Sequence, residues 1–83
     1  MILTKEYLIS KGFHEDEYIG CLTYTFHEGM VNGEYLSMSI RVYNHKGSFI
    51  VEAFNGNEMV RINTNSVERV NQTLSFLKIR ERI

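Results

Sequence analysis

The 83-residue chain contains no proline and only one cysteine, Cys21. An absence of proline fits a chain made mostly of regular elements joined by short turns. A lone cysteine cannot form an internal disulfide, which excludes the disulfide-stapled class of small secreted domain. The apolar run at residues 1–3 is too short for a signal peptide, and no window approaches the roughly 20 apolar residues of a membrane span. We therefore expect a cytoplasmic protein with no membrane contact.

The chain also lacks a large excess of charge of either sign, since its formal net charge is −1. No strong overall field exists to attract nucleic acid or an anionic membrane. The charge is nevertheless uneven: residues 1–60 carry four basic and eight acidic side chains, and residues 61–83 carry five and two. The basic end includes Lys78, Arg80 and Arg82. These side chains either complement the dipole at the C-terminus of a helix or form a small basic docking patch.

Alternation of apolar and polar side chains is clearest at residues 35–43. A period of two predicts a strand with one face in water. The inward set is Leu36, Met38, Ile40 and Val42. Three further runs are rich in β-branched and aromatic types and also predict strands: residues 17–28, 48–54 and 58–63. Tight turns containing glycine separate the runs, so sequential strands should pair antiparallel.

Helical patterns lie at the two ends of the sequence. Thr4 is a suitable N-cap for a short helix that Gly12 ends. Asn65 is expected to cap a second helix, with Glu68 three residues further on as in a capping box. The apolar stripe of this helix is Val67, Val70, Leu74 and Leu77.

The order of these elements predicts one α+β domain over residues 1–83. It consists of a helix, a four-stranded antiparallel meander and a second helix, with both helices on one face of the sheet. A chain of this length has room for one core only.

Candidates for catalysis and metal binding are few. His14, Glu15 and Asp16 are neighbours in a predicted turn, and neighbours in a turn do not converge on one point. Cys21 and His27 share a strand face but lie about 20 Å apart at 3.3 Å per residue, too far for a nucleophile and its base. We therefore assign no catalytic residue, no metal ligand and no cofactor, and expect a protein that is not an enzyme.

The wet face of the sheet is the best candidate surface. Its leading residues are Tyr35, Arg41 and Tyr43, and the same face should carry Thr23, Thr25, His27, Glu52, Phe54 and Arg61. Tyrosine with arginine is typical of protein interfaces, and the same mixture can stack nucleic-acid bases. The face is also an ordinary arrangement for an antiparallel sheet, where tyrosine and threonine pair across strands.

A second apolar stripe follows if the last helix continues to the end of the chain. Phe76, Ile79 and Ile83 would then lie away from the core, with Arg80 and Arg82 beside them. Either the helix ends before Ile79 and the tail folds back, or the stripe contacts another chain. We expect the second arrangement, a homodimer or a protein docking site.

Two segments carry a resemblance. LTKEYL at residues 3–8, followed by KGF at 11–13, resembles the opening of small uncharacterised proteins encoded by phages and prophages of gut bacteria. VERVNQTL at residues 67–74 is similar to their closing helix, although those proteins often have Val-His-Gln-Leu-Gln there. The resemblance implies an accessory product of a mobile element, and it carries no activity or site residue.

The order of elements is also similar to that of double-stranded-RNA-binding domains. The lysine cluster that opens their last helix is missing here, because TNSVE stands at residues 64–68. We therefore expect a small non-enzymatic module that binds a protein partner. The alternative is a nucleic-acid-binding domain that uses the exposed sheet face and the basic C-terminal helix.

Overall fold

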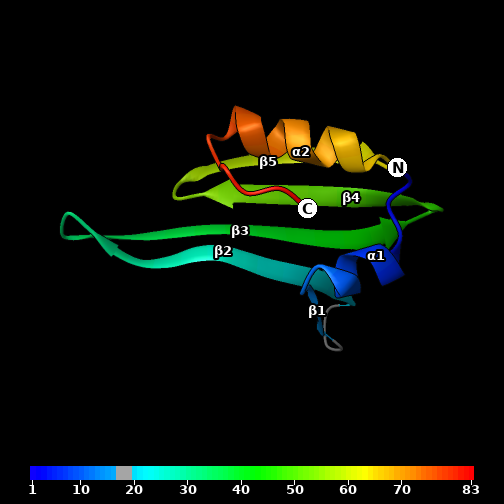
Figure 1. Cartoon of the computed structure of the whole chain (residues 1–83), viewed down its shortest axis with the longest axis horizontal. Coiled ribbons are helices and arrows are strands. Elements are labelled where there is room, and N and C mark those ends of the chain that lie inside the picture. The colour runs from blue at the N-terminus through cyan, green and yellow to red at the C-terminus, as the bar shows by residue number, and fades with distance from the viewer. Residues whose placement is uncertain (17–19) are drawn as a thin grey trace.

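The computed structural model describes residues 1–16 and 20–83 and contains one antiparallel sheet and two helices (Figure 1). The elements are α1 (Lys5–Ser10), β1 (His14–Asp16), β2 (Cys21–Val31), β3 (Glu34–His45), β4 (Ser48–Asn55), β5 (Glu58–Thr64) and α2 (Val67–Phe76). The strands lie in the order β1-β2-β3-β4-β5, and every neighbouring pair is antiparallel. The prediction of an α+β chain with an antiparallel sheet is confirmed.

The predicted count of four strands is wrong, because the residues that the structure describes form five. His14–Asp16, expected to be a turn, forms the edge strand β1 and pairs His14 with Thr23 and Asp16 with Cys21. All three residues of β1 are exposed, so the strand has no apolar alternation that a sequence pattern could reveal. The first predicted strand began at residue 17, but residues 17–19 lie outside the described part of the chain. The described strand β2 begins at Cys21.

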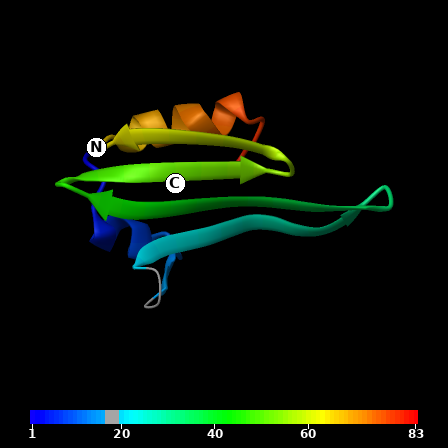
Figure 2. The same ribbon diagram turned by 180° about the vertical axis from the view of Figure 1, so that it is seen from behind.

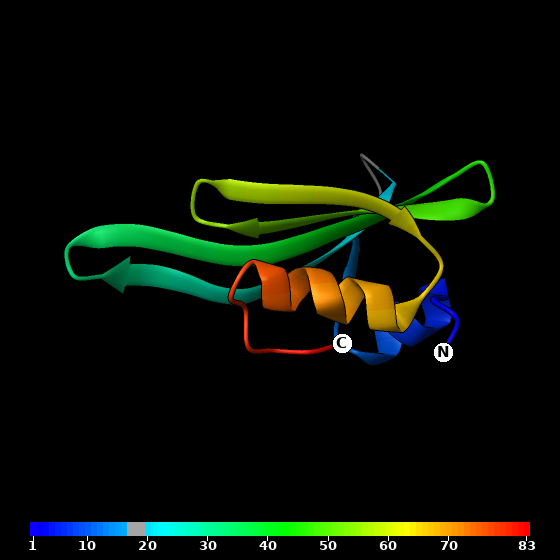
Figure 3. The ribbon, with the colours of Figure 1, turned by 90° about the horizontal axis from the view of Figure 1, so that it is seen from above.

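Two-residue turns connect the central strands. Asn32 and Gly33 both have positive φ, as do Lys46 and Gly47. Positive φ at both central residues is the signature of the turn that matches the twist of a hairpin. The β2–β3 hairpin is the longest, and its free end projects beyond the rest of the sheet (Figures 1 and 3).

A bulge in β2 changes which side chains share a face. The register with β3 shifts between Thr25 and His27, so Tyr24 is opposite Ile40 and His27 is opposite Met38. An extra residue in one strand reverses the alternation that follows it. His27 therefore lies on the helix side of the sheet, and its predicted place beside Thr25 on the wet face is wrong.

The core lies between the sheet and the helices, which are on the same side of it (Figures 2 and 3). Helix α1 packs against β2, and α2 packs against β4 and β5. Leu8 of α1 and Leu74 of α2 are fully buried together with Val42 and Val51 of the sheet. The apolar stripe assigned to the last helix thus meets Met38, Ile40 and Val42 of β3 in one cluster. Leu36, the fourth residue of the predicted inward set, is not part of this cluster and lines a surface groove instead.

Helix α2 begins one residue later than expected. Its N-cap is Ser66, whose hydroxyl accepts a hydrogen bond from the Arg69 amide at 3.3 Å. The side-chain oxygen of Asn65 instead accepts a hydrogen bond from the Phe49 amide at 3.2 Å. The backbone carbonyl of Asn65 accepts a hydrogen bond from the Leu3 amide at 2.7 Å. Asn65 therefore joins the N-terminal segment and β4 to the start of the helix, which a local capping pattern does not predict.

The end of α2 overturns the predicted second stripe. The helix stops at Phe76, and Lys78 adopts a left-handed conformation with φ +62° that turns the chain back. Ile79 and Ile83 are 1% and 7% exposed within the core cluster. Phe76 alone remains outside, with 76% of its surface exposed. The exposed stripe of Phe76, Ile79 and Ile83, on which a homodimer or a docking site was expected, is therefore not formed, because two of its three side chains belong to the core.

The segment after α2, residues 77–83, is held against the domain by polar contacts. The side chain of Asn71 accepts a hydrogen bond from the Ile83 amide at 2.8 Å and donates to the Ile83 carbonyl at 3.3 Å. The Arg82 guanidinium donates to the carbonyls of Ile79, Arg80 and Glu81. Lys78, Arg80 and Arg82 thus do not form the last turn of a helix, which contains no basic residue.

Candidate functional site

The sheet face opposite the helices carries a row of charged side chains across three strands. Figure 2 shows this open face, with both helices behind it. Arg41 of β3 is the register partner of Glu52 of β4, and Glu52 is in turn the partner of Arg61 of β5. Directly opposed residues on one face lie about 4.5–5.5 Å apart at Cβ, so the three side chains are brought together by register alone.

Glu52 is 3% exposed although neither of the two described helices covers this face. Arg41 donates from Nε to Oε1 at 2.8 Å, and its Nη2 lies 2.6 Å from the same oxygen. Arg61 donates from Nε and Nη2 to Oε2 at 3.0 and 2.7 Å. Each carboxylate oxygen therefore has its own guanidinium, and the two arginine side chains enclose the acid between them. We call this group the Arg41–Glu52–Arg61 cluster.

The neighbouring aromatic and apolar residues fix the arginines further. The Arg41 guanidinium lies 5.5 Å from the ring centre of Phe54, a cation–π distance. Tyr43 and Cys21 border the cluster, and Cys21 is buried. Together with the cluster they line a shallow cavity of about 250 Å³.

Protonation of the cluster follows from this geometry. Burial alone would raise the pKa of the Glu52 carboxyl, but hydrogen bonds from Arg41 and Arg61 outweigh it and hold that pKa below its ordinary value. Glu52, and then Tyr43, raise the pKa of the Arg61 guanidinium. Burial raises the pKa of the Cys21 thiol, which disfavours the reactive thiolate. The cluster is therefore fully ionised at neutral pH and carries one net positive charge.

The cluster has unused hydrogen-bonding capacity on its exposed side. The contacts to Glu52 use Nε and Nη2 of each arginine and do not involve Nη1, and the Arg61 guanidinium also interacts with the Tyr43 side chain. The side chains of Arg41 and Arg61 are 40% and 59% exposed, so a ligand can reach them. The chemistry that fits two such groups is a carboxylate or another oxyanion.

The structure brings together only part of the predicted surface. Arg41 and Tyr43 both line the cavity. Tyr35 does not, because it lies near the hairpin end, about 20 Å along β3 from Arg41. There its hydroxyl donates to Glu28, which raises the pKa of the phenol. Glu52 and Arg61 had been placed on this face from the sequence, but the burial of Glu52 was not predicted, because it depends on strand register.

Other kinds of site are not evident in the part of the chain that is described. There, no three histidine, cysteine or acidic side chains gather to hold a metal ion. None of the described helices is long and apolar enough to cross a bilayer. Comparisons of the chain with protein-family models, curated proteins and solved structures found no match.

Proposed function

We propose that the protein is a non-enzymatic interaction module whose open sheet face binds an acidic segment of a protein partner. The observation that supports this is the Arg41–Glu52–Arg61 cluster, in which a buried carboxylate holds two partly exposed guanidiniums in place. Its setting, we propose further, is the cytoplasm, as an accessory product of a mobile element, which rests on the resemblance at residues 3–8 and 67–74.

Preorganisation is the first argument. A free arginine loses about 1.5–2 kcal/mol of rotamer entropy when a partner fixes it. In the cluster Glu52 already holds both guanidiniums, so much of this cost does not arise on binding. Arginine and tyrosine are also the residue types that dominate binding energy at protein interfaces, and Tyr43 stands beside the cluster.

Charge balance is the second argument. Two guanidiniums and one carboxylate leave one positive charge, which one carboxylate of a partner neutralises. A partner carboxylate that reaches the guanidiniums of Arg41 and Arg61 accepts charge-assisted hydrogen bonds, which are about twice as strong as neutral ones. An acidic side chain supplies such a carboxylate, and so does the C-terminus of a chain. A basic or neutral internal segment supplies no carboxylate.

Nucleic-acid binding is the alternative. Tyr43 and Phe54 lie beside the arginines, an arrangement that can stack exposed bases. Against it, the acidic Glu52 is at the centre of the face, and the chain as a whole carries a net charge of −1. Phosphate binding is driven by an excess of basic side chains, which the whole chain lacks.

The test is a titration of the ¹⁵N-labelled protein that follows the Arg Nε signals. N-acetylated hexaglutamate amide is the acidic probe, and a ten-residue single-stranded oligothymidylate is the nucleic-acid probe. We expect hexaglutamate to shift the Nε signals of Arg41 and Arg61 and to leave that of Arg69, which lies on α2, unchanged. The double variant R41K/R61K keeps both charges but loses the planar fork, and it should bind at least tenfold more weakly.

Binding of the oligothymidylate in place of hexaglutamate would replace the proposal by the nucleic-acid alternative. Equal shifts at Arg69, or equal affinity for R41K/R61K, would show a diffuse charge effect and overturn the proposal. Folding of the variant is checked by its amide spectrum, which must retain the wild-type dispersion.

A further inference from the structure

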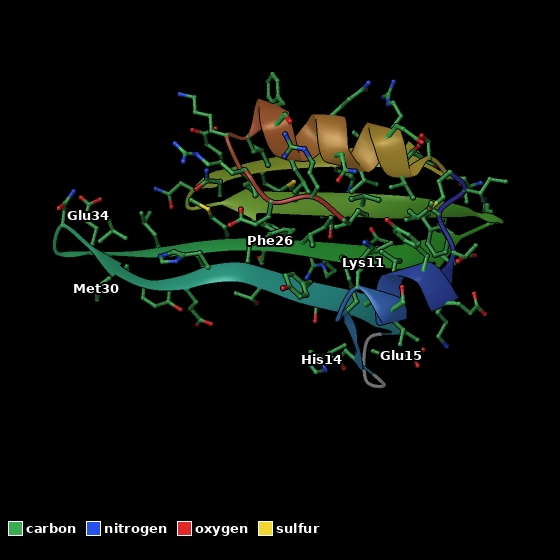
Figure 4. All side chains as sticks on the ribbon, in the orientation of Figure 1. Lys11, His14, Glu15, Phe26, Met30 and Glu34 are labelled. Carbon is green, nitrogen blue, oxygen red and sulfur yellow. The ribbon has the colours of Figure 1, made fainter. Side chains whose placement is uncertain are left out.

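The β2–β3 hairpin presents a free strand edge. β3 occupies one edge of β2 along almost its whole length, whereas β1 pairs with the other edge only at Cys21–Thr23. On that other edge, no described strand lies beside β2 from Tyr24 to Val31. The hairpin end of this length of backbone projects beyond the rest of the sheet, and Met30 and Glu34 lie there (Figure 4). An unpaired strand edge offers N–H and C=O groups to another extended chain.

A groove on the helix side of the hairpin borders this edge. Its hairpin wall is formed by His27, Val31, Leu36 and Met38, and its other wall by Lys78, Arg80 and Glu81 of the segment after α2. The groove has a volume of about 340 Å³, and its floor is apolar. The β2 bulge is what turns His27 and Val31 toward it.

The charges at the groove are only partly balanced. Among the described residues, Lys78 and Arg80 form no ion pair within 4.0 Å, and Glu81 is the single acidic side chain lining the groove. Arg82 does not add to this charge at the groove, since its guanidinium donates to backbone carbonyls and to Ser75. The groove thus combines an apolar floor with a basic rim, and it favours a ligand that is apolar and acidic on the same face.

We propose that this hairpin is a second docking site, which takes an extended peptide segment of a partner by strand addition to β2. Alternate side chains of an added strand face the same side of the sheet, so apolar residues would enter the groove and an acidic residue would reach Lys78 and Arg80. The site is separate from the Arg41–Glu52–Arg61 cluster, which lies on the opposite face.

A second copy of the chain fits this edge poorly. The groove-side residues of its own β2 would be His27, Gly29 and Val31, none of which is acidic. Pairing two β2 edges would therefore leave Lys78 and Arg80 without a carboxylate. The occupant is better matched by a foreign segment that alternates apolar and acidic residues on one face with polar residues on the other.

The experiment uses the heptapeptide acetyl-Thr-Leu-Thr-Val-Thr-Glu-Thr-amide, whose Leu, Val and Glu share one face when extended. A control peptide has Lys in place of Glu. Two further peptides carry N-methyl groups, one on the amides of Leu, Val and Glu and the other on those of Thr. Alternate amides of a strand point to opposite edges, so only one of the two methylated peptides can still pair with β2.

We expect the Glu peptide to shift the backbone amide signals of residues 24–31 and 78–81 in a saturable titration. The Lys peptide should bind at least tenfold more weakly than the Glu peptide. One of the two N-methylated peptides should bind at least tenfold more weakly than the unmethylated Glu peptide, whereas the other should bind as tightly. The variant K78N/R80Q should weaken binding of the Glu peptide, whereas R41K/R61K should leave it unchanged. Asn is chosen at position 78 because it tolerates the left-handed conformation found there.

Five results would overturn the proposal. Equal binding of the two N-methylated peptides would exclude strand pairing, and shifts confined to other residues or no binding of the Glu peptide would exclude the site. A concentration-dependent dimer without peptide, with amide protection appearing at residues 24–31, would show that a second copy occupies the edge. Loss of binding in R41K/R61K would place the peptide on the open face instead.

Discussion

The backbone amide of Ile79 donates a hydrogen bond to the carbonyl of Leu74 at 2.9 Å, and this contact ends α2. The amide of Lys78 donates to the carbonyl of Ser75 at the same distance, which completes a Schellman motif. Asn55, the last residue of β4, donates from its side chain to the Leu77 carbonyl at 2.7 Å. The end of α2, the end of β4 and the segment after α2 are thus joined by hydrogen bonds. The side chains of Leu74 and Ile79 pack in the same core.

Replacement of Ile79 by serine should destabilise the domain, and the same replacement at Phe76 should not. Ile79 is buried and its loss leaves a cavity, so we expect the free energy of unfolding to fall by about 2–4 kcal/mol. Phe76 is exposed, and F76S should change the free energy of unfolding by less than about 0.5 kcal/mol. Urea denaturation measures both. A larger loss for F76S than for I79S would mean that the tail does not occupy the core.

Glycine at position 78 should stabilise the protein. Lys78 has φ +62°, a region that costs a residue with a Cβ roughly 1 kcal/mol and costs glycine little. K78G should therefore raise the melting temperature by a few degrees. Lys11, the C-cap of α1, has φ −91°, so K11G is a matched control that should bring no gain. Equal effects of the two substitutions would contradict the left-handed turn at Lys78.

The ionised form of Glu52 should contribute to stability near neutral pH. Its pKa is held below the ordinary value of 4.5, so the folded state binds fewer protons than the unfolded state in this range. The stabilisation is complete above the ordinary pKa and is lost as the pH falls through the lowered one. E52Q should be less stable than the wild type at pH 7, by about 1–3 kcal/mol. The difference in free energy of unfolding between E52Q and the wild type should become smaller below pH 4.5.

Glu15 provides the control for this pH dependence. It forms an ion pair with Lys5 at 2.7 Å, but both side chains are about half exposed. Solvent-exposed pairs of this kind contribute little to stability, so E15Q should change the free energy of unfolding little at both pH values compared below. Urea midpoints at pH 7 and pH 3 compare the variants. A gap between E52Q and the wild type that stays constant with pH would contradict the proposed role of the Glu52 charge.

Much of the fold could be predicted because its local signals agree with its tertiary contacts. The alternation at residues 35–43, the Asn32-Gly33 turn and the Thr4 cap all act through near neighbours in the sequence. The missed features depend on distant residues or on an atypical one. β1 is a strand only because β2 lies beside it, and α2 ends at a lysine where glycine is the usual signal.

The candidate site could be predicted only as a surface. Period-two alternation placed Arg41, Tyr43, Glu52 and Arg61 on one face, and the structure agrees. Which of them are in contact depends on register across three strands, and turn lengths alone did not establish that register. The bulge at Phe26 shows the limit most clearly, since a single extra residue moved His27 to the other face.

The affinity for acetylated hexaglutamate amide of two matched triple variants tests the proposed function most directly. R41Q/E52Q/R61Q removes the cluster and avoids leaving Glu52 buried without a partner. K11Q/E58Q/R69Q makes the same change in net charge at exposed residues that belong neither to the open face nor to the groove beside Lys78 and Arg80. Isothermal titration calorimetry should show at least a tenfold loss of affinity for the first variant and less than a twofold change for the second. Equal losses, or no loss in the first, would contradict the assignment of the open face as the site that binds an acidic partner.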